Sequence, residues 1–151
     1  MQKTEAPHLY FVNGYYYLLT AEGGTGRGHS VTVCRSKAIT GLYELAPNSP
    51  ILTASDKADS SLQCAGHGSL VQTENGKWYM AYLCTRPLKD ATILGRKITI
   101  QEVYWTEDHW LRLKSERNSP QKNTIVQTVD KVEQQVNHHF LDTFERDISP
   151  I

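Results

Sequence analysis

The first residue whose type and position could do chemistry is Glu5, within the segment Thr4-Glu5-Ala6-Pro7-His8-Leu9-Tyr10. Its carboxylate precedes Pro7 at the entrance of an aromatic, strand-like run. Proline lacks an N–H group and biases the preceding residue away from the helical region, so we expect an extended backbone at Ala6. A carboxylate held at the mouth of a strand can do acid–base chemistry, and it can equally be an exposed surface acid. These residues alone leave both interpretations open.

Two other groups of residues suggest ligand sites but lack the required patterns. The segment 22–29 contains four glycines, yet it has no Lys-Ser/Thr ending of a P-loop and runs into a strand-like segment instead of a helix. We therefore expect a bent loop between strands, with His29 either in that loop or at the rim of a pocket. His138 and His139 are adjacent, and neighbouring side chains of an extended chain point in opposite directions, which argues against a shared metal ion.

Composition restricts the classes of partner. The chain has 151 residues, enough for one domain with a core, and its 16 Lys and Arg residues balance its 16 Asp and Glu residues. A neutral chain has no net charge with which to attract nucleic acid or an anionic membrane, so neither is expected as a partner. No apolar run is long enough to span a bilayer, and residues 1–5 lack the apolar core of a signal peptide. A cytoplasmic location is the resulting expectation.

The cysteines argue against a disulfide framework. Cys34, Cys64 and Cys84 are odd in number and have no Cys-x-x-Cys spacing, which also argues against a thiolate zinc site. Each lies in or next to an apolar, strand-like segment. We expect buried free thiols.

The secondary structure is predicted to consist of antiparallel hairpins. Aromatic and β-branched runs flank Asn13-Gly14, and a similar pair of runs flanks Asn75-Gly76, 62 positions later. Asn-Gly between such runs is the strongest short-range signal of a hairpin. A third pair of runs, 98–105 and 110–113, flanks a turn at Glu107-Asp108. No convincing helix is expected before residue 120, so the fold class is all-β.

The repeated hairpins predict part of a β-propeller. Each unit is too short to bury both of its faces, so neighbouring units must stack. A spacing of roughly 60 residues, with about four short strands in each unit, suits the four-stranded blades of a propeller. Residues 1–113 supply about two such blades, whereas a closed propeller needs at least about four. The polar, turn-rich stretch that follows Leu113 is typical of a linker, which we place at 114–135.

Four ordered groups of residues resemble the family 43 glycoside hydrolases, in the branch of the β-xylosidases and α-L-arabinofuranosidases. They are Thr4–Tyr10 with Asn13–Thr25, then Ala65–Val71, then Arg86-Pro87, then Ile93–Arg96 with Ile100-Gln101. The resemblance extends over residues 4–113. It implies the C-terminal blades of a five-bladed β-propeller and inverting hydrolysis of the xylosides or arabinosides of hemicellulose. Residues 136–151 faintly resemble the start of the β-sandwich that follows the propeller in larger xylosidases.

The resemblance also implies roles for three side chains. Glu5 matches the general acid of the family, which protonates the leaving oxygen. Arg96 matches an arginine that binds the sugar, and His67 matches a histidine near the substrate at the channel centre. That histidine is often linked through water to a metal ion, commonly calcium. The resemblance implies no required cofactor and allows a structural calcium ion near His67.

Several positions depart from the family pattern. The general base and a second aspartate that tunes the acid both precede the acid's motif in the family, but only four residues precede Glu5 here. Lys97 replaces a usual glutamate, and Thr85 replaces a usual glycine. We therefore predict a glycosidase fragment that supplies the acid, lacks the base and is weakly active or inactive alone, with missing N-terminal blades as its partner. The alternatives are a non-catalytic carbohydrate-binding remnant and a remnant that assembles with copies of itself.

Overall fold

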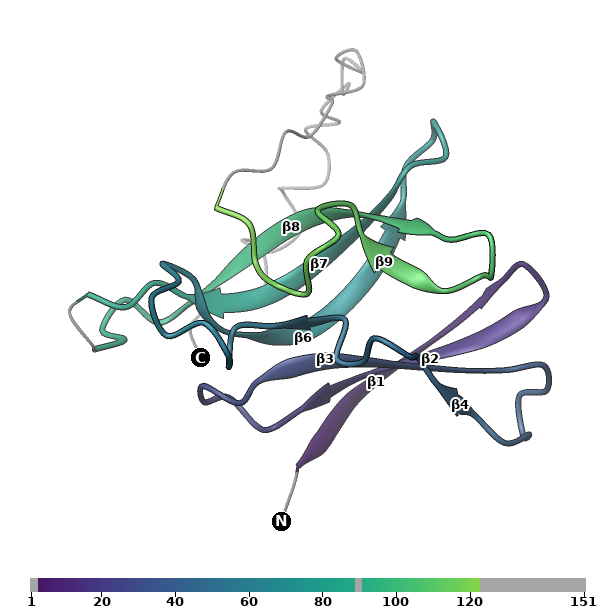
Figure 1. The fold of residues 1–151 in the computed structure, drawn as a ribbon, viewed down its shortest axis with the longest axis horizontal. Helices are drawn as coiled ribbons and strands as arrows, with labels where there is room; N and C mark the ends of the chain where they lie inside the picture. The colour runs from purple at the N-terminus through teal and green to yellow at the C-terminus, as the bar shows by residue number, and fades with distance from the viewer. Residues whose placement is uncertain (1–2, 89–90, 123–151) are drawn as a thin grey trace, which may run out of the picture.

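The computed structural model describes residues 3–88 and 91–122 of the chain (Figure 1). These residues form two antiparallel sheets, and none of them is helical, so the all-β prediction is confirmed. The strands are β1 (Thr4–Val12), β2 (Tyr15–Glu22), β3 (Ser30–Ser36), β4 (Glu44–Leu45), β5 (Leu52–Thr53), β6 (Gln63–Gln72), β7 (Trp78–Thr85), β8 (Arg96–Trp105) and β9 (Leu111–Leu113). Most of the predicted linker 114–135, all of segment 136–151, and His138 and His139 lie outside the described residues.

The first sheet contains strands β1 to β5, in the order β1-β2-β3-β4, with β5 also paired to β3. The predicted hairpin at Asn13-Gly14 is present, and both turn residues have positive φ angles, 50° and 78°. Two such residues suit the tight turns that match the twist of a hairpin. The glycine-rich segment bends between β2 and β3 as expected.

The second sheet has the order β6-β7-β8-β9. β6 and β7 form the predicted hairpin around Asn75-Gly76, in which the Thr73 N–H bonds to the Lys77 carbonyl oxygen. β8 and β9 pair on either side of the turn at Glu107-Asp108, so the third predicted hairpin is also present.

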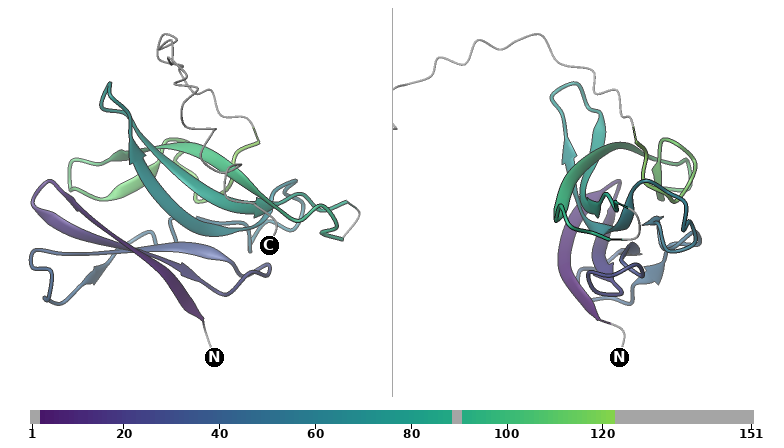
Figure 2. Two further views of the ribbon diagram at one scale, coloured as in Figure 1. Left: turned by 180° about the vertical axis from the view of Figure 1, so that it is seen from behind. Right: turned by 90° about the vertical axis from the view of Figure 1, so that its left-hand side faces the viewer.

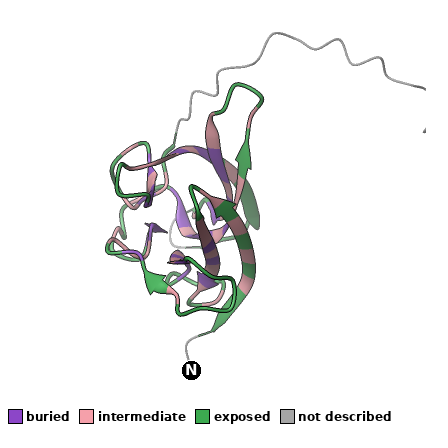
Figure 3. Cartoon of the chain, turned by 90° about the vertical axis from the view of Figure 1, so that its right-hand side faces the viewer, coloured by how far each residue is buried: buried purple, intermediate pink, exposed green. Residues whose placement is uncertain are grey.

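The main core lies between the two sheets, which face each other in Figures 1 and 2. Alternation along each strand selects the buried side chains, because successive residues of a strand point to opposite faces. β2 and β3 contribute Tyr17, Leu19, Val31 and Val33, and the second sheet contributes residues that include Met80, Tyr82, Val103 and Leu111. Figure 3 shows buried segments of strand inside the stack and exposed segments on the outer parts of the strands and in the loops.

Two local expectations need correction. Ala6 is not extended, because its φ angle is 50°. The pairing of β1 with β2 shifts register between Glu5 and His8, and this bulge outweighs the preference that Pro7 imposes on Ala6. Of the three free cysteines, only Cys84 is buried, whereas Cys34 and Cys64 are half-buried.

The segment that follows β9 is hydrogen-bonded to the sheets as far as residue 121. Asn118 Nδ2 donates to the carbonyl oxygens of Asn48 and Pro50, each at 2.8 Å, and the Asn118 carbonyl oxygen accepts from the Thr53 N–H. The Gln121 N–H donates to Gln101 Oε1 at 3.3 Å.

The domain boundaries stay predictions. In the part of the chain that the structure describes, no helix is long and apolar enough to cross a membrane.

Candidate active site

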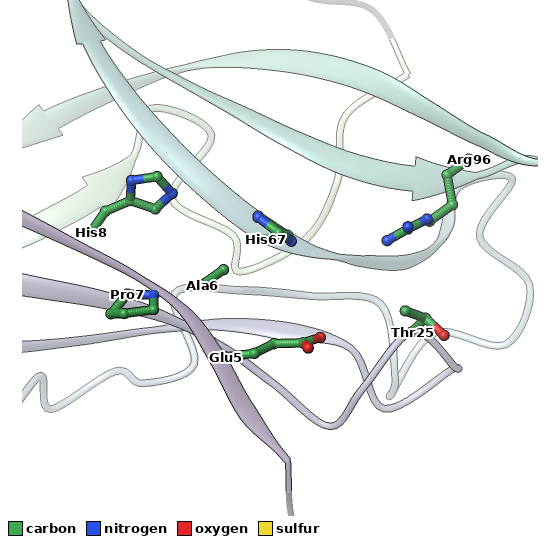
Figure 4. A pocket seen from close by; sticks show the side chains of 7 residues that line it. All are labelled: Glu5, Ala6, Pro7, His8, Thr25, His67 and Arg96. Atoms are coloured by element: carbon green, nitrogen blue, oxygen red, sulfur yellow. The ribbon is translucent and has the colours of Figure 1, made fainter.

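An open hollow of about 560 Å³ lies between the starts of β1 and β8 and the middle of β6 (Figure 4). Its lining includes all three side chains singled out from the sequence, Glu5, His67 and Arg96. Arg96 points toward His67, and the Glu5 carboxylate lies on the opposite side of the hollow, near Thr25. Residues that are 91 positions apart in the sequence therefore share one concave surface.

The bulge in β1 lies next to Glu5. Glu5 pairs with Ala21, and the next paired residue of β1 is His8, opposite Leu19. Two residues of β1 are thus inserted against one residue of β2, which bends the strand and changes the direction of its side chains. As a result Glu5, Ala6, Pro7 and His8 all line the hollow, which regular alternation would not allow.

β6 is irregular at the corresponding place. Its register against β7 shifts on both sides of Gly66, and His67 has a φ angle of 57°, in the left-handed region that non-glycine residues seldom adopt. Cys64, three residues earlier, also has a positive φ of 52°. This irregular stretch of β6 brings the His67 side chain into the hollow.

A buried histidine, His29, supports this stretch of β6. A Cβ atom added to Gly66 would lie 2.4 Å from the His29 ring, so a residue without a side chain is needed there. His29 is only 1% exposed, and its Nδ1 atom lies 3.2 Å from the Glu22 carbonyl oxygen. A carbonyl oxygen only accepts, so Nδ1 carries the proton and Nε2 keeps a free lone pair. Nε2 has no hydrogen-bond partner among the described residues.

The surroundings of His29 favour its neutral form. Burial lowers its pKa, the hydrogen bond to the Glu22 carbonyl opposes this, and the charge of His67 lowers it further. A neutral ring that packs on Gly66 links the glycine-rich loop to β6. His29 therefore lies beneath the hollow instead of at its rim, the other place considered for it from the sequence.

The glycine-rich loop forms another wall of the hollow through Thr25. The loop is closed at its base, where a Cβ atom on Gly23 would lie 2.1 Å from the Gly28 carbonyl oxygen. The Glu22 carboxylate accepts hydrogen bonds from the Thr4 and Thr20 hydroxyls, at 2.7 and 3.1 Å. These contacts fix the loop to the two strands of the first hairpin.

Arg96 begins β8 and pairs with Thr85, the last residue of β7. Thr85 is buried, and its hydroxyl donates to the Gln63 carbonyl oxygen at 3.2 Å, which ties the end of β7 to the start of β6. A guanidinium group presents a rigid fork of N–H donors that suits adjacent hydroxyl groups or a carboxylate. Because Arg96 is the first residue of β8 and is paired with β7, its backbone is held in place.

Glu5 is the only carboxylate among the described residues that line the hollow. Acid–base chemistry at a glycosidic bond uses two carboxyl groups, so this wall can supply one half of such a pair. The described residues also contain no group of three or more His, Cys, Asp or Glu side chains that could hold a metal ion. They do not by themselves fit Ca²⁺, which takes six to eight oxygen ligands. A water-linked calcium ion at His67 stays a prediction.

Sequence reasoning did not identify Thr25, His8 or the supporting role of His29. A usable signal existed for Thr25, because it ends the first group of residues that carries the family resemblance. The packing of His29 against Gly66 had no such signal, since it joins a loop residue before β3 to a residue of β6, 37 positions away.

Comparison with known sequences identifies a family. The model of glycosyl hydrolases family 43 matches residues 1–111. A xylosidase/arabinosidase 43B of Humicola insolens is 50% identical over 113 residues, which cover 74% of this chain and 21% of that protein. A beta-xylosidase of Bacillus subtilis is 48% identical over 117 residues, covering 71% of this chain and 22% of that one. The chain thus spans about a fifth of the length of these relatives.

Solved structures agree with this assignment. The crystal structure of a xylan beta-1,4-xylosidase from Bacillus halodurans superposes with a TM-score of 0.82 at 50% identity, over 85% of this chain and 25% of that chain. The two sheets are two blades of a five-bladed β-propeller, so the predicted fold class is confirmed. The chain belongs to glycosyl hydrolase family 43.

Proposed function

We propose that this chain is the part of an inverting glycoside hydrolase that supplies the general acid for cleavage of xylosides or arabinosides of hemicellulose. The observation that carries the proposal is the convergence of Glu5, His67 and Arg96 on one open hollow. Relatives that are named as xylosidases or arabinosidases support the substrate class.

In the proposed reaction, the Glu5 carboxyl group donates its proton to the glycosidic oxygen as the bond from that oxygen to the anomeric carbon breaks. A second carboxylate removes a proton from a water molecule, which attacks the anomeric carbon from the opposite face and inverts its configuration. No second carboxylate lines the hollow among the described residues. The base is therefore assigned to N-terminal blades of the propeller, which are the proposed partner of this chain.

Arg96 and His67 would bind the sugar. The guanidinium fork of Arg96 can donate two hydrogen bonds to neighbouring hydroxyl groups, an arrangement that a lysine cannot copy. In Figure 4 the His67 ring lies beside the tip of Arg96 and across from the Glu5 carboxylate, within reach of a pentose that occupies the hollow. The side chain at position 97 follows Arg96 on a strand and so points to the opposite face. The substitution of lysine for the usual glutamate there is expected to act on Arg96 only indirectly.

A chimera tests the catalytic role of Glu5. Residues 1–111 would replace the matching segment of the Bacillus subtilis relative, which restores a full-length propeller. We expect activity toward aryl xylosides, and we expect Glu5→Ala to reduce it by about 10²–10⁴-fold, the usual contribution of general acid catalysis. The loss should be larger for a poor leaving group, such as a second xylose, than for dinitrophenol, which leaves without protonation.

Two outcomes would contradict this assignment. Equal losses with both leaving groups would show that Glu5 does not protonate the leaving oxygen. Retention of full activity by the Glu5→Ala chimera would remove it from the site altogether. Glu22→Ala is the matched control, because Glu22 is the nearby carboxylate that binds Thr4 and Thr20 and does not line the hollow.

Sugar binding without turnover is the second candidate for the chain on its own, and it is favoured because the described residues place a single carboxylate in the hollow. Titration of the 151-residue chain with xylose, followed by NMR, should shift the ring signals of His67, and Arg96→Ala should weaken the titration. Absence of any shift at molar-range xylose would eliminate this candidate. His109→Asn, in the distant β8–β9 turn, should leave the titration unchanged.

A further inference from the structure

A second hollow adjoins the candidate active site. Its volume is about 400 Å³, and it shares Thr25 and Arg96 with the first hollow. Its walls come from the glycine-rich loop between β2 and β3, the start of β6, the end of β7 and the segment that leads into β8. Figure 1 shows that loop and that segment at the same end of the two sheets. Both sheets of the chain therefore contribute walls to this second hollow.

The charge of the second hollow is of one sign. Arg27 and Arg96 both line it, and none of the described residues that line it is an aspartate or a glutamate. Neither guanidinium group has an ion-pair or hydrogen-bond partner among residues 3–88 and 91–122. The chain as a whole has equal numbers of basic and acidic residues, so folding and not composition brings these positive charges together. A concave surface lined by charges of one sign attracts ligands of the opposite sign.

The backbone of Arg27 is held by a turn of the glycine-rich loop. The Gly26 carbonyl oxygen accepts a hydrogen bond from the His29 N–H at 3.0 Å, which closes a turn with Arg27 at its second position. His29 is buried, so the turn is anchored beneath the surface. The backbone of Arg96 is held by its pairing with β7. Because both backbones are fixed before a ligand arrives, less freedom is lost when the two arginines bind it.

The rest of the lining offers hydroxyl groups and free space. Thr92 lines the hollow, and so does Thr85, whose hydroxyl donates to the Gln63 carbonyl oxygen and keeps lone pairs that can accept. A Cβ atom added to Gly26 or Gly95 would meet no atom within 4 Å, so both glycines border open space. Guanidinium forks beside hydroxyl groups suit a ligand that carries a carboxylate together with hydroxyl groups.

We propose that the second hollow binds the carboxylate of a sugar acid, a uronic-acid unit attached to the pentoside whose reacting ring occupies the first hollow. Arg27 donates to this carboxylate, and Arg96, which lines both hollows, lies between the two units. The hollow has the size of a small-molecule site, for which about 300–1,000 Å³ is typical. The choice of a sugar acid rests on the proposed hydrolase function, whereas the anion site itself does not. Arg27 is then the residue that favours charged over neutral substrates.

Cys64 lines the same hollow and can report on its charge. Iodoacetate and iodoacetamide both alkylate a thiolate with loss of iodide, and they differ by one negative charge. In the 151-residue chain, we expect the ratio of the iodoacetate rate to the iodoacetamide rate to be about tenfold higher at Cys64 than at Cys34 in low salt, and to fall as salt is added. Cys34 lies on β3, outside the hollow, and peptide mass spectrometry follows each thiol separately.

Two matched variants test the source of this charge. Arg27→Gln should lower the ratio at Cys64 toward that at Cys34. Lys37→Gln removes the same charge just beyond the other end of β3 and should leave the ratio unchanged. Equal ratios at the two thiols of the parent chain would show that no positive field acts in the hollow. A high ratio that survives Arg27→Gln would remove Arg27 from the site.

Protection of Cys64 identifies the ligand. Glucuronate should slow its alkylation by iodoacetamide, glucose at the same concentration should not, and Arg27→Gln should abolish the protection. Inorganic phosphate at matched ionic strength tests for an anion that is not a sugar. Protection by phosphate but not by glucuronate would overturn the proposal in favour of an inorganic oxyanion, and protection by neither would exclude an anion site.

The chimera with the Bacillus subtilis relative tests recognition during turnover. We expect Arg27→Gln to lower kcat/KM for a xylobiose that carries a uronic-acid substituent by about tenfold relative to plain xylobiose, because a charge-assisted hydrogen bond is lost. Hydrolysis of both substrates with no change in this preference would contradict the second site alone. Protection of Cys64 by glucuronate without any turnover would contradict only the hydrolase function. Far-ultraviolet circular dichroism confirms that each variant is folded.

Discussion

The buried interface between the two blades and the open hollow at its edge are built from the same two sheets, but in opposite ways. In the interface, β2 and β3 keep a regular register, and alternation places Leu19 and Val33 in the core. At the hollow, β1 and β6 break register beside Glu5 and Gly66. Regular pairing places apolar side chains together in the core and stabilises the fold. Bulges change the direction of the strand, so that polar side chains from different strands point into the hollow. Changes directed at one region should therefore differ in kind from changes directed at the other.

The largest expected effect is a loss of stability, caused by removing a buried side chain from the interface between the two blades. Leu19→Ala removes a fully buried side chain and should lower the free energy of unfolding by about 2–5 kcal/mol. Leu9→Ala removes the same atoms from the outer face, where the side chain is 46% exposed, and should cost less than half as much. Urea denaturation with matched m-values measures both. Equal costs would mean that the two faces of the first blade are equally covered in solution.

The next largest effect is expected from adding a side chain at Gly66, where His29 packs beneath the hollow. Gly66→Ala places a methyl group against the His29 ring and should destabilise the chain by about 1–3 kcal/mol through overpacking. It should also displace His67, which would appear as a changed ring signal in NMR spectra. Gly26→Ala, where no atom lies within 4 Å of an added Cβ, is the control and should be nearly neutral. A neutral Gly66→Ala would contradict the close packing of His29.

A pH titration tests the burial of His29. Burial lowers the pKa of His29 below its ordinary value of 6.5, so near and below that pH the unfolded chain binds more protons than the folded chain. The free energy of unfolding should therefore fall as the pH falls through 6.5, and His29→Asn should flatten this dependence. His8→Asn, at a half-buried position on β1, should preserve it. An unchanged slope in His29→Asn would assign the effect to other groups.

The smallest effect is expected at the opposite edge of the interface. The guanidinium of Arg35 lies 3.8 Å from the Trp110 ring centroid and donates to the Asp108 carbonyl oxygen, while its ion pair with the mostly exposed Glu44 spans 3.4 Å. Glu44→Gln should cost less than about 0.5 kcal/mol, because solvent screens exposed pairs. Arg35→Ala should cost more, since it removes the ring contact as well. Thermal unfolding at two salt concentrations distinguishes the two contributions.

Local sequence determined the long hairpin strands and their antiparallel pairing, but not the short strands β4 and β5. The Asn-Gly turns fixed both long hairpins because those residues accept positive φ angles, and alternation fixed which side of β2 and β3 became core. The residue groups that resemble family 43 also singled out Glu5, His67 and Arg96, and the structure places all three around one hollow.

Only the tertiary structure decided how these residues reach one another. Ala6 and His67 adopt positive φ angles against their local preferences, because the pairing of β1 with β2 and of β6 with β7 requires bulges there. The need for glycine at position 66 comes from His29, a residue of another blade. Contacts between distant segments leave no periodic pattern in the sequence. The long strands could therefore be predicted from the sequence, whereas the bulges, the support from His29 and the shape of the hollow depend on how the blades pack.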